Sequence, residues 1–166
     1  LDSAAIVRGL GLRIPLIGIH GYTLSAAVRE ALDAPRSAVV DEQYKIAISR
    51  LGQRIRVSGG AEIGHNSHKH HQATIKTLYR VLDDWFPGAA RTQDNVQIWK
   101  GARPMMPDGL PIIGASGIPG VWLNMGHGAN GWTLACGCAR ALTDCMHGNS
   151  PAIDMQGLGL ERLQQR

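Results

Sequence analysis

The spacing of the apolar residues changes from a strand period to a helix period in the middle of this 166-residue chain, and that change restricts the folds open to it. In residues 37–63, apolar and polar side chains alternate, which predicts strands with one buried face. Gly52, between two such runs, predicts the turn of an antiparallel hairpin. In residues 68–85 the period is that of an amphipathic helix, and its predicted apolar side carries Ile75, Leu78, Leu82 and Trp85.

The last third of the chain predicts strands followed by a helix. Residues 95–101 and 120–125 are strand candidates, and residues 130–147 have the length and spacing of a helix, with Gly148 at the position of its C-terminal cap. We expect an irregular tail from Ser150. The predicted buried side of the helix carries Trp132, Ala135, Cys138, Ala139, Leu142 and Met146. These elements predict the α+β class with a mostly antiparallel sheet.

The composition is that of a globular protein, and it argues against nucleic-acid binding. Apolar residues make up 44% and charged residues 18%, so a core can form. The formal net charge of +4 is spread without a basic stripe, so we expect no nucleic-acid partner. A mildly positive field would suit a small anionic substrate or cofactor.

Neither a membrane span nor a secretion signal is expected. The apolar runs are interrupted well short of the roughly 20 residues that cross a bilayer, and we find no signal peptide. Because the first residue is Leu1 rather than Met, we expect that the chain was cut from something longer or processed. Three cysteines in one predicted helix, Cys136, Cys138 and Cys145, favour free packing thiols in a reducing compartment.

Residues 126–131 read Gly-His-Gly-Ala-Asn-Gly and match the glycine pattern of dinucleotide-binding loops. The pattern follows a predicted strand and opens a predicted helix, but the further strand with a terminal acid that completes such a unit is missing. Glycines allow close backbone approach, and N–H groups at a helix start favour an electron-rich partner. A ligand contact and a turn that serves packing alone both stay open.

Two further groups of residues could carry chemistry. Arg103, at the end of an apolar strand, could bind a carboxylate, although a surface ion pair is the commoner role of a single arginine. A cluster of four histidines has spacings that could hold a metal, or could simply be a solvated helix start: His65, His68, His70 and His71.

Four segments together resemble a known family. They are Ile14–Ser25, Tyr44–Ile63, Trp99–Gly114 and Leu123–Gly137. They are similar to the C-terminal part of the D-amino acid dehydrogenase small subunit, an FAD enzyme of the group that includes D-amino acid oxidase, glycine oxidase and sarcosine oxidase. The resemblance extends over roughly residues 1–150.

The resemblance implies a division of the chain and a role for particular residues. Residues 13–98 would form a sheet-rich substrate domain, and residues 1–12 and 99–166 would belong to a Rossmann-like FAD-binding domain. Arg103 would bind the substrate carboxylate and Tyr44 would line the pocket. The residues that would lie against the flavin ring are Gly126, His127, Gly128, Ala129, Asn130, Gly131, Trp132 and Thr133. The implied reaction is hydride transfer from the substrate α-carbon to flavin, giving an imino acid that hydrolyses, with no protein nucleophile or metal.

The sequence also departs from the family in ways that affect substrate and cofactor. His20, Ala102 and Asn130 replace usual family residues, which leaves the identity of the substrate open. The glycine motif that binds the ADP part of FAD belongs to an N-terminal half that these residues lack. We therefore expect apolar surface where that half, or another subunit, would pack, and weak FAD affinity without it.

Three functions compete at this point: an FAD-dependent D-amino acid dehydrogenase or a related glycine, sarcosine or amine oxidase, an inactive remnant or assembly domain, and a metal-binding protein. The expected location is cytoplasmic. Oxygen and a membrane quinone both stay open as electron acceptor, and a quinone would require peripheral association with the inner membrane.

Overall fold

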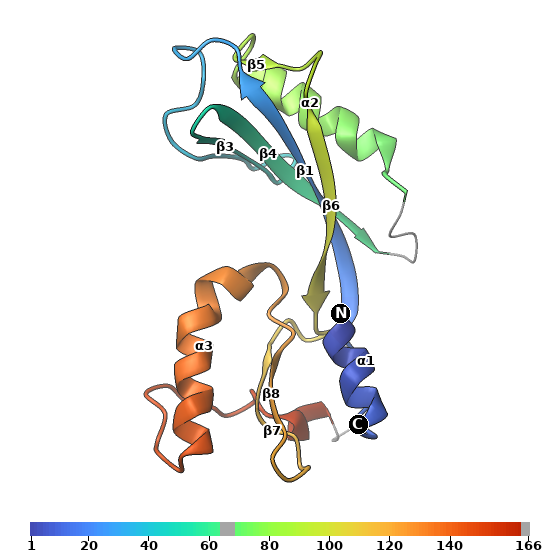
Figure 1. Ribbon diagram of the computed structural model, residues 1–166, viewed down its shortest axis with the longest axis vertical. Helices are drawn as coiled ribbons and strands as arrows, with labels where there is room; N and C mark the ends of the chain where they lie inside the picture. The colour runs from blue at the N-terminus through green and yellow to red at the C-terminus, as the bar shows by residue number, and fades with distance from the viewer. Residues whose placement is uncertain (64–68, 164–166) are drawn as a thin grey trace. The chain divides into compact units, whose positions relative to one another are not determined.

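The computed structural model describes residues 1–63 and 69–163 and contains two compact units (Figure 1). The first unit comprises Leu1–Gly18 and Arg103–Arg166, and the second comprises Ile19–Ala102. Each unit has its own apolar core. The α+β class expected from the sequence is confirmed, whereas the assignment of substrate and flavin roles to the two parts stays a prediction.

A sheet with the strand order β2-β3-β4-β1-β5 builds the second unit, and β6 also pairs with β1. Its strands are β1 (Ile17–Val28), β2 (Val39–Asp41), β3 (Ile46–Leu51), β4 (Arg54–Ile63), β5 (Ala90–Arg91) and β6 (Gln97–Met105). The hairpin predicted around Gly52 is confirmed, because β3 and β4 pair antiparallel from Ala47↔Ser58 to Leu51↔Arg54. Gly52 has a φ of 59°, which suits a glycine in the turn.

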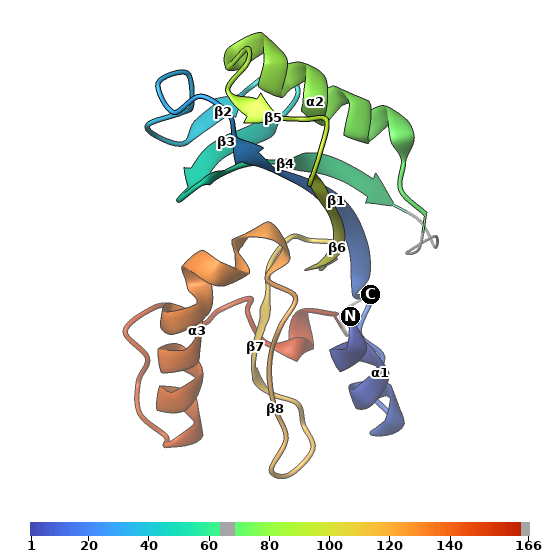
Figure 2. The ribbon, with the colours of Figure 1, turned by 45° about the horizontal axis from the view of Figure 1, so that its top comes forward.

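Helix α2 (Gln72–Trp85) lies across one face of this sheet (Figure 2). Ile75, Leu78 and Leu82 are buried, as their spacing predicted, and pack with strand residues such as Leu24 and Val57.

Trp85, the last residue of the predicted apolar side, is not buried. Its side chain is 49% exposed at the last position of α2. Its indole N–H donates to Oδ2 of Asp41 at 2.9 Å. The helix ends there, so the ring rests at the rim of the core rather than inside it.

The first unit is built around a two-stranded antiparallel sheet of β7 and β8. Its elements are α1 (Asp2–Gly9), β7 (Ile112–Ala115), β8 (Trp122–Met125), the 3-10 turn η1 (Gly128–Asn130), α3 (Gly131–Met146) and the 3-10 turn η2 (Leu160–Leu163). Its core includes Ile14, Met106, Ile112 and Leu123, and also Leu160 from the tail. The irregular tail expected after Ser150 is therefore wrong in part, since its end packs into the core.

The buried side predicted for α3 is mostly wrong. Cys138 is buried and Leu142 is half-buried, but the other four residues are exposed. Trp132 is 96% exposed and Met146 is 50% exposed. The helix contacts β7 and β8, and its buried residues are Cys138, Ala141 and Asp144. Apolar residues thus occupy both sides of α3.

All three cysteines are free thiols, as expected. Cys138 is buried and Cys145 is half-buried, but Cys136 is exposed, so the packing role predicted for it is not seen. In residues 1–63 and 69–163, no helix combines the length and the apolar character needed to cross a membrane.

Candidate active site

The loop between β8 and α3 has a backbone that requires glycine. Gly126 has a φ of 82° and Gly128 a φ of 57°, both in the left-handed region. A Cβ atom on Gly126 would lie 2.6 Å from Cγ of Met106, and one on Gly128 would collide with the Met105 thioether. Two methionines therefore fill the space against this glycine loop, which we define as residues 126–130.

The end of β6 lies directly against the glycine loop. Met105 and His127 form an antiparallel β-bridge, although they are far apart in the sequence. Arg103 stands two residues before Met105 on the same strand, roughly 7 Å along the backbone. The structure thus brings the strand that carries Arg103, a half-buried residue, to the loop of the predicted flavin contacts.

His127 offers a buried polar atom at the centre of the loop. Its Nε2 is buried and has no hydrogen-bond partner within the described part of the chain. Burial lowers the pKa of this imidazole below 6.5 and favours its neutral form. A neutral imidazole can donate or accept one hydrogen bond at such an atom, so the site suits a polar ligand edge.

The start of α3 completes this side of the site. Asn130 is the N-cap, but its side chain makes no capping hydrogen bond. The first N–H groups of a helix have no partner within the helix, and the helix dipole makes this end slightly positive. Of the residues predicted to meet flavin here, Ala129, Asn130, Trp132 and Thr133 are exposed and Gly131 is half-buried. An anionic or electron-rich group is the ligand that this end favours.

Tyr44 lies in the second unit, in the turn between β2 and β3. The Arg80 guanidinium stacks over its ring at 4.7 Å from the centroid. The Tyr44 backbone N–H donates to Oδ1 of Asp41 at 2.7 Å, and Gln43 donates to its hydroxyl. These partners all belong to the second unit, and the role of Tyr44 in a substrate pocket stays a prediction.

A buried polar cluster in the second unit was not predicted from the sequence. Tyr22, only 1% exposed, donates its hydroxyl to Oε2 of Glu62 at 2.5 Å and accepts the His71 backbone N–H at 2.9 Å. The Lys100 ammonium lies 3.1 Å from the same Glu62 oxygen, with its side chain 3% exposed. We call Tyr22, Glu62 and Lys100 the Tyr22 cluster.

The charges of the Tyr22 cluster stabilise each other. The Tyr22 hydroxyl and then the Lys100 ammonium hold the pKa of Glu62 below its ordinary value. Burial disfavours the charged form of Lys100, but its contacts with Tyr22 and Glu62 prevail and raise its pKa. All three residues lie in the family-like segments, but contacts over such long sequence separations cannot be derived from local spacing.

The proposed histidine metal site falls largely outside the described residues, because His65 and His68 lie in the range 64–68. His71 shares a hydrogen bond between Nδ1 and Thr74 Oγ1 at 2.9 Å, and the His70 ring meets Tyr22 edge-on at 5.9 Å. Within the residues that the structure describes, no three His, Cys, Asp or Glu side chains are placed to hold a metal ion.

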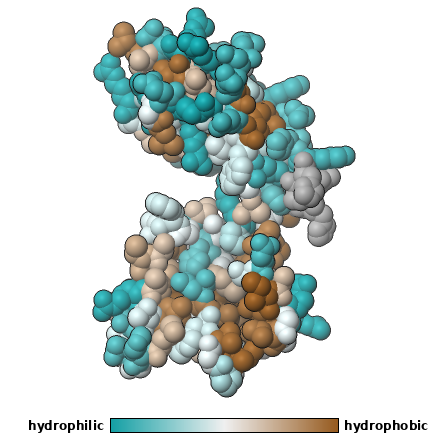
Figure 3. All heavy atoms as spheres, in the orientation of Figure 1, coloured by the Kyte–Doolittle hydropathy of each residue, from teal (hydrophilic) through white to brown (hydrophobic). Residues whose placement is uncertain are grey.

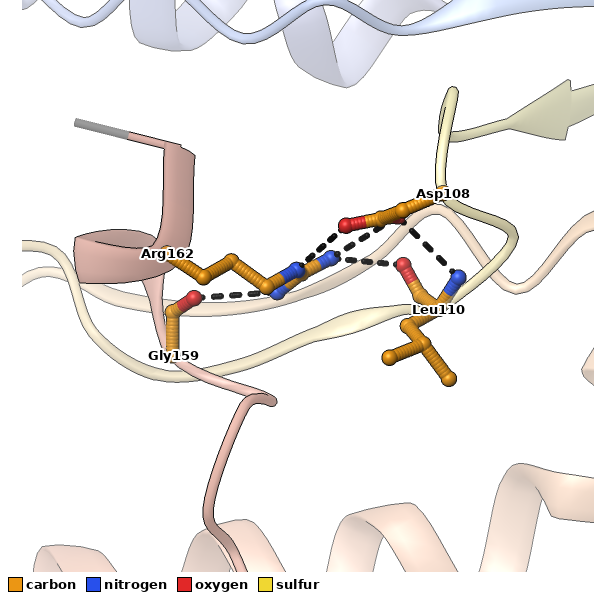
Figure 4. A network of polar contacts seen from close by, with 4 residues as sticks. All are labelled: Asp108, Leu110, Gly159 and Arg162. Atoms are coloured by element: carbon orange, nitrogen blue, oxygen red, sulfur yellow. Dashed lines mark hydrogen bonds and ion pairs between the residues drawn. The ribbon is translucent and has the colours of Figure 1, made fainter. Parts of the chain in front are cut away.

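The turn that follows Met106 is bound to the tail of the chain by contacts of the Arg162 side chain (Figure 4). The Gly109 N–H donates to the Met106 carbonyl at 3.0 Å, which makes the Pro-Asp-Gly turn predicted by the residue types. Arg162 pairs with Asp108 and donates to the carbonyl oxygens of Leu110 and Gly159. This contact places η2 against the strand end that supports the glycine loop.

Comparison with known proteins identifies the family. Residues 2–145 match the model of a family described as FAD dependent oxidoreductase, named DAO. The chain belongs to this family. The predicted resemblance is thereby confirmed, and with it the FAD-dependent oxidoreductase class.

Close relatives are D-amino acid dehydrogenases. The chain is 46% identical over 160 residues to one from Cereibacter sphaeroides, covering 96% of this chain and 36% of the relative. It is 42% identical over 164 residues to one from Bradyrhizobium diazoefficiens, covering 99% of this chain and 39% of the relative. The chain thus spans well under half the length of these relatives.

Solved structures of other proteins share the fold. Glycine oxidase from Geobacillus kaustophilus matches with a TM-score of 0.81 at 19% identity, over 96% of this chain and 42% of the other. L-amino acid deaminase from Proteus vulgaris matches with a TM-score of 0.76 at 20% identity, over 98% of this chain and 40% of the other. At such identities the likeness concerns the fold alone.

Proposed function

We propose that this chain is the C-terminal, substrate-side part of an FAD-dependent D-amino acid dehydrogenase that deaminates D-amino acids oxidatively. The observation that carries the proposal is the bridge between Met105 and His127, which joins the Arg103 strand to the glycine loop. The class of substrate comes from relatives that are 42–46% identical over nearly the whole chain.

The glycine loop fits a flavin edge. The unpartnered Nε2 of His127 offers one hydrogen bond to such an edge. The start of α3 would stabilise negative charge on the reduced ring. Bound here, flavin would accept the hydride from the substrate α-carbon, and the protein would bind and orient both partners.

Arg103 is the group of this chain best suited to hold the substrate carboxylate. A guanidinium binds a carboxylate through two parallel hydrogen bonds, which fixes the orientation of the substrate as well as its position. Tyr44 is proposed to line the substrate pocket, as the family resemblance implies. The residues of the chain would thus fix the substrate while the cofactor carries the oxidation.

The residues that bind the ADP part of FAD are proposed to lie in the portion of the enzyme that the relatives have and this chain does not span. The complete glycine motif of a dinucleotide-binding unit needs a following strand and acid, and α3 is followed by the tail instead. Quinone reduction, with peripheral binding to a membrane, and reduction of oxygen are both compatible with this arrangement.

The test is a complex made by co-expressing this chain with the remaining part of the Cereibacter sphaeroides relative. We expect the purified complex to show flavin absorbance and to oxidise D-alanine. A colourless complex, or one without turnover, would sink the dehydrogenase proposal and favour an assembly domain. A preference for glycine or sarcosine over D-alanine would favour an oxidase of the related group.

The Arg103 role is tested in the same complex with Arg103→Leu. Loss of a charge-assisted carboxylate contact should raise KM for D-alanine by roughly 10–100-fold. Arg56→Leu, at an exposed position of β4, is the matched control and should leave KM unchanged. An equal KM in both variants would refute the role of Arg103.

A further inference from the structure

The second unit has a cavity of about 540 Å³ that none of the sites described above accounts for. It is lined by residues of α2, by Arg29 just after the end of β1, and by residues of the segment 88–93, which contains β5. Its volume is in the range of cavities that hold small molecules. The residues that line it include none of the glycine loop, the Tyr22 cluster or the strand end at Arg103.

Backbone hydrogen bonds hold the walls of this cavity in place. The Arg29 N–H donates to the Ala89 carbonyl at 2.7 Å, and Val28 and Ala90 are paired across β1 and β5. The Ala89 N–H donates to the Phe86 carbonyl at 3.2 Å, which joins this segment to the end of α2. A cavity whose walls are already fixed loses little conformational entropy when a ligand binds.

Two aromatic side chains give the cavity apolar walls. Tyr79 of α2 and Phe86 at its C-terminal cap are half-buried, pack against the core of the second unit and also line the cavity. The visible face of the second unit is mostly hydrophilic (Figure 3), so aromatic surface at a cavity is a local exception there. Aromatic rings in such a position can bind an apolar or aromatic group of a ligand.

The cavity also carries charges of both signs. Arg29 and Asp83 line it, and no described residue forms an ion pair or a side-chain hydrogen bond with either of them. Arg80 lines it as well, but its guanidinium stacks over the Tyr44 ring. A guanidinium binds a carboxylate through two parallel hydrogen bonds, and a carboxylate accepts hydrogen bonds from an ammonium group. An α-amino acid carries both a carboxylate and an ammonium on one carbon atom.

We propose that this cavity binds a free α-amino acid with an aromatic or other apolar side chain. Arg29 holds its carboxylate, Asp83 accepts hydrogen bonds from its ammonium, and its side chain packs on Phe86. A phosphate or a dicarboxylate fits less well, because it would place negative charge close to Asp83. The inference does not rest on the proposed function, and its test needs neither flavin nor turnover.

Binding of L-phenylalanine to the 166-residue chain is measured through the backbone amide NMR signals. N-acetyl-L-phenylalanine, which lacks the ammonium, is the matched probe. We expect saturable shifts at Ala89, Thr92 and Gln93. The acetylated probe should bind about fivefold more weakly, because it makes no charged contact with Asp83. Binding of L-phenylalanine should persist in Arg103→Leu, which separates this cavity from the proposed carboxylate contact of the active site.

Arg29→Gln and Asp83→Asn test the two charged contacts, with Arg91→Gln and Asp84→Asn as matched controls. All four residues are exposed, and Arg91 and Asp84 do not line the cavity. Arg29→Gln should weaken binding of both probes by about tenfold. Asp83→Asn should weaken binding of L-phenylalanine alone, so that this variant binds the two probes equally. Both controls should bind as the wild type does.

Any of four results would overturn the proposal. They are the absence of saturable shifts at these amides up to about 10 mM L-phenylalanine, equal binding of the two probes by the wild type, equal binding by Arg29→Gln and Arg91→Gln, and a preference for L-phenylalanine that survives in Asp83→Asn. The last result would leave a carboxylate site and refute the amino acid as its ligand.

Discussion

Nε of Arg162 lies 2.7 Å from Oδ2 of Asp108, a residue 54 positions earlier in the chain. The same guanidinium donates to the Leu110 carbonyl at 2.7 Å and to the Gly159 carbonyl at 2.9 Å. One arginine thus joins the tail to the turn that follows Met106, and Met106 packs against Gly126 of the glycine loop. The position of the loop therefore depends on a contact made by the end of the chain.

Replacing Asp108 with Asn should weaken this connection. Asn keeps the oxygen that accepts the Leu110 N–H but loses the charge opposite Arg162. The carboxylate is partly exposed, so we expect a loss of about 0.5–1 kcal/mol in the free energy of unfolding at neutral pH. Asp154→Asn is the control, because Asp154 accepts the Gln156 N–H in the same local geometry. Urea unfolding of both variants gives the comparison.

The difference in the free energy of unfolding between wild type and Asp108→Asn should depend on pH. The hydrogen bond from Arg162 holds the pKa of Asp108 below its ordinary value. A carboxyl group whose pKa is lowered in the folded state stabilises the fold in full at pH values above its ordinary pKa of about 4. This stabilisation is lost as the pH falls through the lowered pKa. A difference that stays constant from neutral pH to about pH 3 would contradict the ion pair as its source.

Gly126→Ala should destabilise the first unit more than its backbone conformation alone requires. Gly148 has a similar φ of 72° at the end of α3, but a Cβ atom there meets nothing within 4 Å. Gly148→Ala should therefore cost about 1–2 kcal/mol for the left-handed conformation. Gly126→Ala should cost roughly 1–3 kcal/mol more, because Met106 must move. Equal losses in the free energy of chemical unfolding for the two variants would show that Met106 moves aside without an energetic cost.

The local pattern predicted the parts of the fold that depend on neighbouring residues. Alternation around Gly52 gave the β3–β4 hairpin, and the three-four spacing placed Ile75 and Leu78 in the core. The same reasoning could not assign the sides of α3, because both sides are apolar and the spacing does not say which one faces β7 and β8.

Some parts of the candidate site were also predicted from the sequence, and others were not. The glycine loop and the Arg103 strand were recognised from sequence motifs, but their junction through Met105 and His127 required the structure. The contacts of Arg162 with the turn after Met106 were not predicted, because an irregular tail has no periodic pattern. Contacts that join distant segments leave no trace in local spacing.

His127→Gln should remove part of the pH dependence of stability. Burial lowers the pKa of His127 below 6.5, so the unfolded chain binds its proton more readily than the folded one. The stability that this group contributes is present above about pH 6.5 and is lost as pH falls through the lowered pKa. Unfolding midpoints measured between neutral and mildly acidic pH should fall less in His127→Gln. His147→Gln, exposed beyond the end of α3, is the control for loss of an imidazole and should follow the wild type.

Tyr22→Phe should destabilise the second unit far more than Tyr79→Phe. Both rings pack in the same core, but the Tyr22 hydroxyl donates to Glu62 and accepts the His71 N–H. Its removal takes away the acceptor of the His71 N–H. It also raises the Glu62 pKa toward its ordinary value, since the hydroxyl is the main cause of its lowering. Hydrogen exchange should show the loss at His71 and the first turn of α2 before the rest of the sheet. Equal unfolding midpoints for the two variants would mean that Lys100 alone satisfies Glu62, and that the start of α2 does not depend on Tyr22.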